Sequence, residues 1–385
     1  MTFNGQHIRM AGLFFVQALS RGILLSVIPL QALSIFGDAQ TTSALYFAVS
    51  AGGILAALGM PALIKTIGNY HVFLLGSLLM LISTALLYFN DPVYFALGLF
   101  FHIFSIAAIE VSLTLYVLAR IPRKELTQFE PLRIFSSVLA LTIGPFFGVL
   151  MEARLSHESP FIFSAVCVFL ALGYFRILGL NHVQIRRSGS SDMNPLQYIS
   201  AFIKQPRLRL AYGLVTARSC WWAMFVIYTP IYAVQVGLGE LVGAAIVSLG
   251  TAWTLSVPFW GWFGRKYGVQ FLLKLGFITT SILTMLVYSA TSIPILAASL
   301  MVISALGATM LDGMGNVLFY RAVRGRERSE MTAVFATYRD VSQLAAPGLY
   351  AILLQFFALP VVFISASAWM MLASWYCKYI PKQMR

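Results

Sequence analysis

Two segments, "PALIKTIG" (residues 61–68) and "GWFGRKYG" (residues 261–268), resemble each other at a distance of 200 residues along the chain. Each segment follows an apolar run, and each places a basic residue three positions before its final glycine: Lys65 before Gly68, and Arg265 before Gly268. A repeat at about half the chain length indicates that the fold consists of two similar halves.

The segments on either side of this repeat are long and apolar enough to cross a membrane. The chain has 385 residues, of which 59% are hydrophobic and 10% charged, whereas a soluble domain has about 25% charged residues. Because a membrane-spanning helix needs about 20 apolar residues, we predict spans 1 to 12 at residues 10–36, 41–64, 70–89, 93–119, 130–152, 160–180, 208–236, 241–263, 269–289, 294–320, 331–357 and 360–380. The predicted fold class is an all-α integral membrane protein, with twelve transmembrane helices in two pseudo-symmetric six-helix halves.

The longest hydrophilic segment lies midway along the chain and separates these halves. We predict an N-terminal half at residues 1–180, a cytoplasmic linker at 181–207 and a C-terminal half at 208–385. Within the linker, "PLQYISAFIK" (residues 195–204) is interpreted either as a short amphipathic helix on the membrane surface or as an ordinary loop.

The basic residues are distributed unevenly between the two sides of the predicted membrane. Of the 26 lysines and arginines, 21 lie at the termini, in the even-numbered connections or in the span ends next to them, whereas the odd-numbered connections carry only Arg154. By the positive-inside rule, both termini and the linker are cytoplasmic, and we expect a plasma membrane, the bacterial inner membrane. Since the net charge of +13 follows topology, it does not indicate nucleic acid as a partner.

Apart from the charges near the ends of the predicted spans, seven charged residues are candidates for a functional site, since a charge at the membrane centre costs roughly 2.5–3.5 kcal/mol. Six of them form pairs at equivalent positions of the two halves, and one has no counterpart. The pairs are Arg21 with Arg218, Glu110 with Asp312, and Arg133 with Arg339, and the seventh residue is Asp340. Such a costly set predicts a functional site.

The spans, the cytoplasmic termini, the linker and the basic turns after spans 2 and 8 together resemble the major facilitator superfamily, over the whole chain. In that family the turn usually reads Gly-x-x-x-Asp-Arg-x-Gly-Arg/Lys, but here Lys65-Thr66 and Arg265-Lys266 replace Asp-Arg, so its usual charge lock between the halves is not expected. The segment "ALTIGPFFG" (residues 140–148) resembles the Gly-Pro-x-x-Gly motif of the family's antiporters, with Ala140 in place of one glycine.

This resemblance implies that spans 1, 4, 7 and 10 line a central cavity, joined by spans 5 and 11, and that spans 3, 6, 9 and 12 form an outer shell. The charges agree with this expectation, because spans 6, 9 and 12 carry only terminal charges and span 3 carries none. The resemblance also implies a secondary transporter that acts as a monomer.

The acidic residues inside the spans are candidates for proton coupling. Glu110, Asp312 and Asp340 are interpreted as groups that bind and release a proton, because removal of a carboxylate from water favours its neutral form; the alternative is that they form structural ion pairs. His102, eight residues before Glu110, is either a proton relay or a hydrogen-bonded core residue. Two such ligands do not specify a metal site, and we expect neither a metal nor a cofactor.

The basic and aromatic residues are candidates for substrate binding. Four arginines against three carboxylates leave one surplus positive charge, which favours an anionic substrate. The expected binding residues are Arg21, Arg218, Arg339, Arg133, Gln17, Asn316, Trp222, Phe225 and Tyr228. The three aromatic residues follow Arg218 along one helical stripe, which either faces the substrate or packs against neighbouring helices. Arg339 and Asp340 point about 100° apart on one helix, so we expect Arg339 at the cavity and Asp340 against another helix.

Three functions remain open at this point. The first is a proton-coupled antiporter that exports an organic anion with apolar bulk. The second is a proton- or sodium-coupled importer of a carboxylate or phosphorylated metabolite, and the third is a membrane sensor or assembly factor that transports nothing. An enzyme is not expected, because the sequence has no Ser/His/Asp set, zinc motif or phosphate-binding glycine loop.

Overall fold

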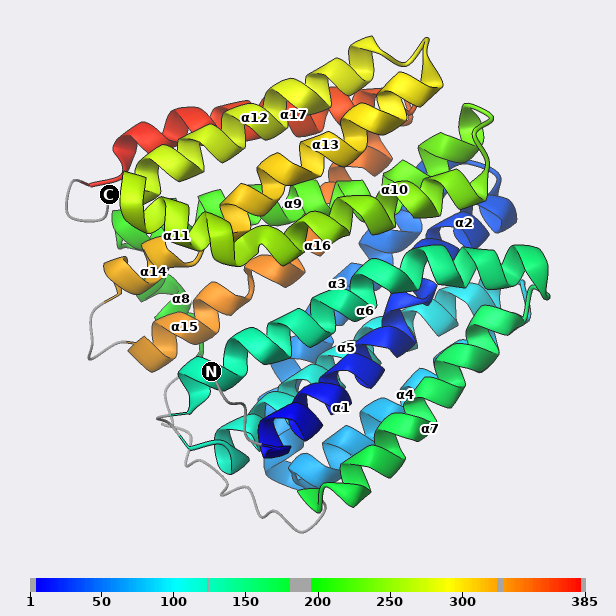
Figure 1. Cartoon of the computed structure of the whole chain (residues 1–385), viewed down its shortest axis with the longest axis vertical. Coiled ribbons are helices and arrows are strands. Elements are labelled where there is room, and N and C mark those ends of the chain that lie inside the picture. Colours follow the sequence, from blue (N-terminus) through cyan, green and yellow to red (C-terminus); the bar gives the residue numbers. More distant parts are fainter. Residues whose placement is uncertain (1–4, 123–124, 181–194, 324–327, 382–385) are drawn as a thin grey trace. The chain divides into compact units, whose positions relative to one another are not determined.

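The computed structural model describes residues 5–122, 125–180, 195–323 and 328–381, and these residues form helices and connecting turns without a strand (Figure 1). The chain divides into two compact units, Met1–Ser188 and Gly189–Arg385. The boundary between the units falls in the predicted linker, and each unit is described separately below.

The N-terminal unit contains seven helices among its described residues. They are α1 (Gly5–Gly22), α2 (Leu24–Phe36), α3 (Ala39–Ile67), α4 (Asn69–Tyr88), α5 (Pro92–Arg120), α6 (Leu126–Arg154) and α7 (Ser159–Ile177). The start of α5 follows from its sequence, because the Asp91 side chain accepts hydrogen bonds from the Val93 and Tyr94 amides and Pro92 occupies the first turn. The first predicted span consists of α1 and α2, which are interrupted at Ile23.

The C-terminal unit begins, in the described part of the chain, with α8 (Pro195–Ile203), so the helical alternative for this segment of the linker is confirmed. The remaining elements are α9 (Pro206–Gln235), α10 (Glu240–Ala252), η2 (Trp253–Ser256), α11 (Val257–Tyr267), α12 (Val269–Ser289), α13 (Pro294–Asp312), α14 (Val317–Ala322), α15 (Arg328–Ala336), α16 (Tyr338–Leu353), α17 (Val361–Tyr376) and η4 (Cys377–Tyr379).

The described residues form eleven helical segments that are long and apolar enough to cross a membrane. These segments match predicted spans 1 to 10 and 12. Span 11 corresponds to α15 and α16, which are separated by a turn at Thr337, so neither helix reaches the length of a span by itself. The predicted all-α membrane fold with two six-helix halves is therefore confirmed, with breaks in individual spans.

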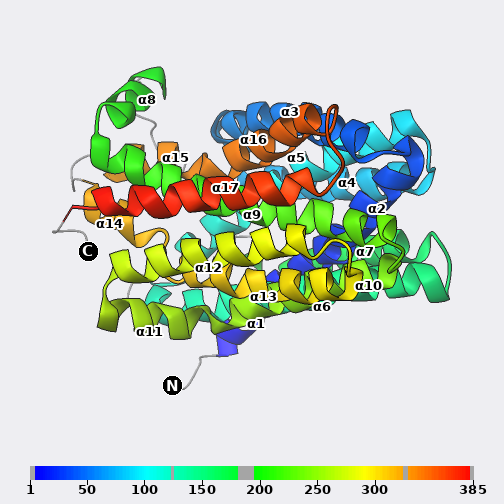
Figure 2. The same ribbon diagram turned by 90° about the horizontal axis from the view of Figure 1, so that it is seen from above.

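Corresponding helices of the two units have similar neighbours. Helix α4 packs against α5 and α7 in the N-terminal unit, and its counterpart α12 packs against α13 and α17 in the C-terminal unit. Figure 2 shows α17 running alongside α12 and α9. The sequence repeat is thus a repeat of packing.

Two glycines allow an unusually close contact between α6 and the junction of α1 with α2. A Cβ atom added to Gly144 would overlap the backbone of Gly22, and one added to Gly148 would overlap the carbonyl oxygen of Ile23. These glycines belong to the segment that resembles the antiporter motif. Their small size has a direct packing role in this fold.

Candidate functional site

In the N-terminal unit, Arg21 of α1 forms an ion pair with Glu110 of α5. The Arg21 Nη1 and Glu110 Oε2 atoms are 3.5 Å apart, and the side chains are 21% and 38% exposed. The charge of Arg21 also acts on the buried His102, which lies eight residues before Glu110 on α5. The predicted arginine, carboxylate and histidine of this half are therefore close together.

Several buried polar atoms near this pair have no hydrogen-bond partner among the described residues. They include Arg21 Nε, His102 Nδ1 and Nε2 of Gln17, which lies one turn before Arg21 on α1. Buried donors without partners are uncommon and call for water or a ligand. This polar group is the candidate site of the N-terminal unit.

In the C-terminal unit, Arg218 of α9 forms the equivalent ion pair with Asp312 of α13. The Arg218 Nε and Asp312 Oδ1 atoms are 3.2 Å apart, and the side chains are only 9% and 24% exposed. The indole Nε1 of Trp222, one turn further along α9, donates a hydrogen bond of 3.1 Å to the other carboxylate oxygen of Asp312. The charge of Arg339 also reaches Asp312.

A break in the tenth span makes room for this pair. Helix α13 ends at Asp312, and residues 313–316 form turns before α14 begins. A Cβ atom added to Gly315 would overlap Arg218 Nη1, so the guanidinium lies directly against this glycine. Asn316 lies at the end of the same turn, and its buried Oδ1 has no hydrogen-bond partner within the described residues.

Tyr338, which sequence reasoning missed, connects Arg218 with Arg339. Its ring centroid is 5.9 Å from Cζ of each arginine, and Arg339 Nε donates to its hydroxyl at 3.2 Å. The tyrosine immediately precedes Arg339 at the start of α16, so its position beside a charge was the available signal. Tyr338 thus contacts two arginines, Arg218 and Arg339, whose positive charges both act on the carboxylate of Asp312.

Arg339 and Asp340 interact with different parts of the unit. Arg339 is exposed and contacts Tyr338, whereas Asp340 is half-buried and acts electrostatically on Tyr212 of α9. The hydroxyl of Tyr212 is 3.0 Å from that of Thr337, at the break between α15 and α16. Arg339 thus interacts with Tyr338, which also lies beside Arg218, whereas Asp340 interacts with α9.

The fourth intramembrane arginine has a partner that the charge count omitted. Arg133 donates to Glu130 through Nε at 2.9 Å and also through Nη2, and its guanidinium lies 5.1 Å from the Phe14 ring centroid. Since Glu130 neutralises Arg133, this arginine adds no net positive charge to the set. The predicted positive surplus is therefore wrong, because it left out a carboxylate within α6.

Two of the predicted aromatic binding residues lie inside the helix packing. Phe225 is fully buried and stacks on Trp221 with centroids 5.2 Å apart, and Tyr228 is fully buried edge-on to Tyr350, 4.9 Å away. Trp222 is only partly buried and contacts Asp312. Of the three, it alone makes a contact with the charged pair.

The described residues contain no group of three or more His, Cys, Asp or Glu side chains that could hold a metal ion.

Solved structures of transporters resemble this chain over nearly its full length. A nucleoside transporter, NupG, has a TM-score of 0.75 at 14% identity, with 98% of this chain and 100% of that chain covered. A POT family transporter in complex with 5-aminolevulinic acid has a TM-score of 0.76 at 13% identity, with 98% and 96% covered. The peptide transporter POT in complex with sulfate has a TM-score of 0.75 at 13% identity, with 98% and 94% covered. At these identities the likeness shows a shared fold.

Curated protein sequences contain no match to this chain. The family model of the Major Facilitator Superfamily, in contrast, matches residues 10–347, which include eleven of the twelve spans in whole or in large part. Together with the membrane-spanning helices and the transporter fold, this match shows that the chain is an integral membrane protein that belongs to the Major Facilitator Superfamily.

Proposed function

We propose that this protein is a proton-coupled transporter of organic anions, and that the Arg218–Asp312 pair couples the proton to the substrate. The observation that carries the proposal is the 3.2 Å contact between an arginine and a carboxylate that are both largely buried, beside a break in α13. Membership of a transporter family supports the coarser statement, that the chain is a secondary transporter.

The Arg218–Asp312 pair has no net charge, and this determines how the binding of a proton changes the affinity for an anion. When Asp312 is ionised, it competes with any other anion for Arg218. When Asp312 binds a proton, Arg218 loses its partner and is free to bind a carboxylate or phosphate in a forked geometry. Proton binding and anion binding therefore favour each other, and by linkage each raises the affinity for the other by the same factor.

Positive coupling of this kind suits symport, in which the proton and the anion cross together. We therefore favour the importer that the sequence left as its second alternative. Arg339, linked through Tyr338 and acting on Asp312, supplies a second positive charge for the anion. Trp222 and Asn316 provide an indole surface and an amide beside the same turn.

The exporter is the second candidate, and it rests on the motif at residues 140–148. An antiporter of anions needs the proton and the anion to exclude each other, which the neutral pair does not provide. The glycines of the motif also have a packing role against Gly22 and Ile23 that is independent of direction. For these reasons we place export of an anion second.

In the N-terminal half, Glu110, Arg21 and His102 form a second proton-binding group in this proposal. Asp340, facing Tyr212, and Arg133, paired with Glu130, have roles at the helix interfaces. Phe225 packs edge-on against Trp222, with ring centroids 5.6 Å apart, and holds it in position, whereas Tyr228 packs against Tyr350. The positive-inside distribution supports a plasma membrane location with both termini in the cytoplasm.

The test is a measurement of lumenal pH in proteoliposomes that contain the purified protein and a trapped pH-sensitive dye. The probes are citrate and a sugar phosphate, which are anions with a carboxylate or phosphate group, and uridine as a neutral control. Symport predicts that an added anion acidifies the lumen, whereas antiport predicts that it makes the lumen alkaline. The sign does not depend on the orientation of the protein in the vesicle.

Two controls separate the remaining alternatives. Asp312→Asn is expected to abolish the pH change, and replacement of the proton gradient with a sodium gradient is expected to drive no uptake. A protein that binds an anion, as seen by a rise in melting temperature, yet moves neither proton nor anion would be the non-transporting sensor instead.

A further inference from the structure

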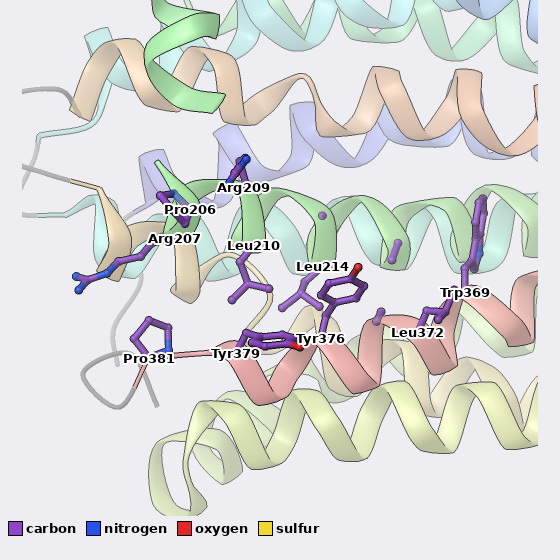
Figure 3. Close-up of a pocket in the computed structure, with 13 residues that line it drawn as sticks. Pro206, Arg207, Arg209, Leu210, Leu214, Trp369, Leu372, Tyr376, Tyr379 and Pro381 are labelled. Carbon is purple, nitrogen blue, oxygen red and sulfur yellow. The ribbon is translucent and has the colours of Figure 1, made fainter. Parts of the chain in front are cut away.

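A cavity of about 790 Å³ lies between α9 and α17 in the C-terminal unit (Figure 3). Leu210, Leu214 and Ala217 of α9 form one wall, and Leu372 and Tyr376 of α17 belong to the other. Figure 3 shows Leu210 and Leu214 extending from α9 toward the two tyrosine rings. Neither Arg218 nor Asp312 lines this groove, which is therefore separate from the proposed coupling pair.

The groove is apolar along its length and basic at one end. Arg207 and Arg209, at the N-terminal end of α9, line this end, and both are exposed. Tyr379, 54% exposed, lies at the same end. An aromatic and basic rim next to an apolar slot is typical of the level of lipid headgroups.

The length of the groove fits one leaflet of a bilayer. Arg207 and Ala217 are ten residues apart on one helix, which corresponds to about 15 Å at 1.5 Å per residue. The hydrocarbon core of a bilayer is about 30 Å thick. The slot thus runs from the headgroup level to about the middle of the membrane.

The equivalent place in the N-terminal unit holds a smaller cavity of about 490 Å³, which is lined by Arg9 and Met10 of α1 and by Ile177 at the end of α7 and does not extend along these helices. There, a Cβ atom added to Gly12 of α1 would lie 3.0 Å from the Tyr174 ring of α7, so the first and sixth spans are in direct contact. In the C-terminal unit, a Cβ atom added to Gly213 of α9 would meet no atom within 4 Å. The seventh and twelfth spans leave room for another molecule.

We propose that this groove binds one anionic phospholipid. The phosphate interacts with Arg207 and Arg209, because arginine matches phosphate oxygens in charge and in geometry. An acyl chain lies along Leu210, Leu214 and Leu372. Basic pockets between membrane helices recognise anionic headgroups in this way. This inference rests on the fold of the C-terminal unit and is independent of the proposed transport reaction.

The variant that tests the proposal is Gly213→Leu. It fills the groove with an apolar side chain at a position where the backbone is helical and the surrounding space is open. The matched control is Gly173→Leu on α7, since Gly173 is also helical, exposed and without atoms within 4 Å of an added Cβ. Both changes replace a helical glycine with a better helix former.

The measurement is the melting temperature of the full chain in detergent, with phosphatidylglycerol or phosphatidylcholine of the same acyl chains added. Native mass spectrometry counts the bound lipids. We expect phosphatidylglycerol to raise the melting temperature more than phosphatidylcholine, and Gly213→Leu to weaken that response at least tenfold in lipid concentration. Gly173→Leu is expected to respond like the unmodified protein.

A second variant, Arg207→Gln with Arg209→Gln, tests the headgroup separately and decides the question if Gly213→Leu does not fold. It is expected to lose the preference for phosphatidylglycerol and to keep the response to phosphatidylcholine. Equal stabilisation of the unmodified protein by both lipids, or an unchanged response in Gly213→Leu, would overturn the proposal. A change from dimer to monomer in Gly213→Leu would instead identify a second copy of the chain as the occupant.

Discussion

The two arginine–carboxylate pairs occupy equivalent positions of the repeat and yet differ in their surroundings. In the N-terminal half, Glu110 lies within the continuous helix α5, is 38% exposed and is 3.5 Å from Arg21. In the C-terminal half, Asp312 ends α13, is 24% exposed, accepts a bond from Trp222 and is 3.2 Å from an arginine that is only 9% exposed.

This difference teaches that a repeated charge pattern does not imply a repeated function. The energetic consequence of separating an ion pair depends on how far its members are removed from water: exposed pairs contribute little, whereas a buried charge that loses its partner is costly. We therefore propose that the C-terminal pair couples two binding events and that the N-terminal pair exchanges protons with water.

Removal of the paired arginine is expected to give the largest difference in stability between the two halves. Arg218→Ala leaves Asp312 without its partner and should lower the free energy of unfolding by about 3 kcal/mol, the low end of the range for a broken buried pair. Arg21→Ala should lower it by about 1 kcal/mol or less, because its pair is more exposed. Denaturation with sodium dodecyl sulfate in mixed micelles measures both, and equal losses would remove the asymmetry between the pairs.

Neutralisation of the carboxylates should give the next largest contrast. Asp312→Asn is expected to reduce proton-driven uptake of a responding anion about 100-fold, within the range for loss of a positioned proton-transfer group, whereas Glu110→Gln reduces it about tenfold or less. Exchange of labelled for unlabelled anion without a gradient is the control, and it should survive in both variants. The reverse ranking would transfer the coupling role to the N-terminal half.

The spans and the helices that carry the paired charges were predictable from sequence because charge is costly in lipid. Long apolar runs identified every span, and the mirrored positions of Arg21 and Arg218 identified the helices that carry the pairs. The break at residues 313–316 coincides with the sequence Gly-Met-Gly-Asn, in which two glycines disfavour a helix, whereas the break at Thr337 has no such signal in its neighbouring residues.

The residues that sequence reasoning missed or misjudged depend on contacts between helices. Tyr338 reaches Arg218 only because α16 packs against α9. Glu130 was left out of the charge count because it lies at the predicted boundary of its span, yet it is one turn from Arg133 and pairs with it. Phe225 and Tyr228 follow the same helical stripe as Trp222. The sequence contains no signal that distinguishes the residue that contacts Asp312, Trp222, from the two that pack inside the unit.

The hydrogen bond from the Trp222 indole to Asp312 is expected to contribute a smaller part of the difference between the two pairs. Trp222→Phe removes the 3.1 Å bond to Asp312 and should destabilise the protein by about 1.5 kcal/mol, the lower end for a hydrogen bond to a charged group. A double-mutant cycle with Asp312→Asn isolates this bond from the change in packing. A coupling energy near zero would mean that the indole contributes shape and no stability to the pair.

The smallest expected effect comes from the glycine that accommodates the guanidinium. In Gly315→Ala the added methyl group would overlap Arg218 Nη1 and lie 2.9 Å from the Leu311 carbonyl oxygen, so Arg218 has to move away from Asp312. We expect proton-driven uptake to fall about tenfold, equivalent to about 1.4 kcal/mol, while Gly173→Ala, which meets no atom within 4 Å, leaves uptake unchanged.

The Arg218→Lys background sharpens this last comparison. A lysine carries a compact ammonium in place of the forked guanidinium, so the methyl group of Gly315→Ala no longer meets an Nη1 atom there. Gly315→Ala should therefore lower the free energy of unfolding of the Arg218→Lys protein less than that of the unmodified protein. Denaturation with sodium dodecyl sulfate in mixed micelles measures both losses. If both backgrounds lose equal stability, the requirement for glycine comes from the turn at residues 313–316 itself. The asymmetry of the two halves would then originate in the backbone of α13 and its turn, with the arginine adapting to it.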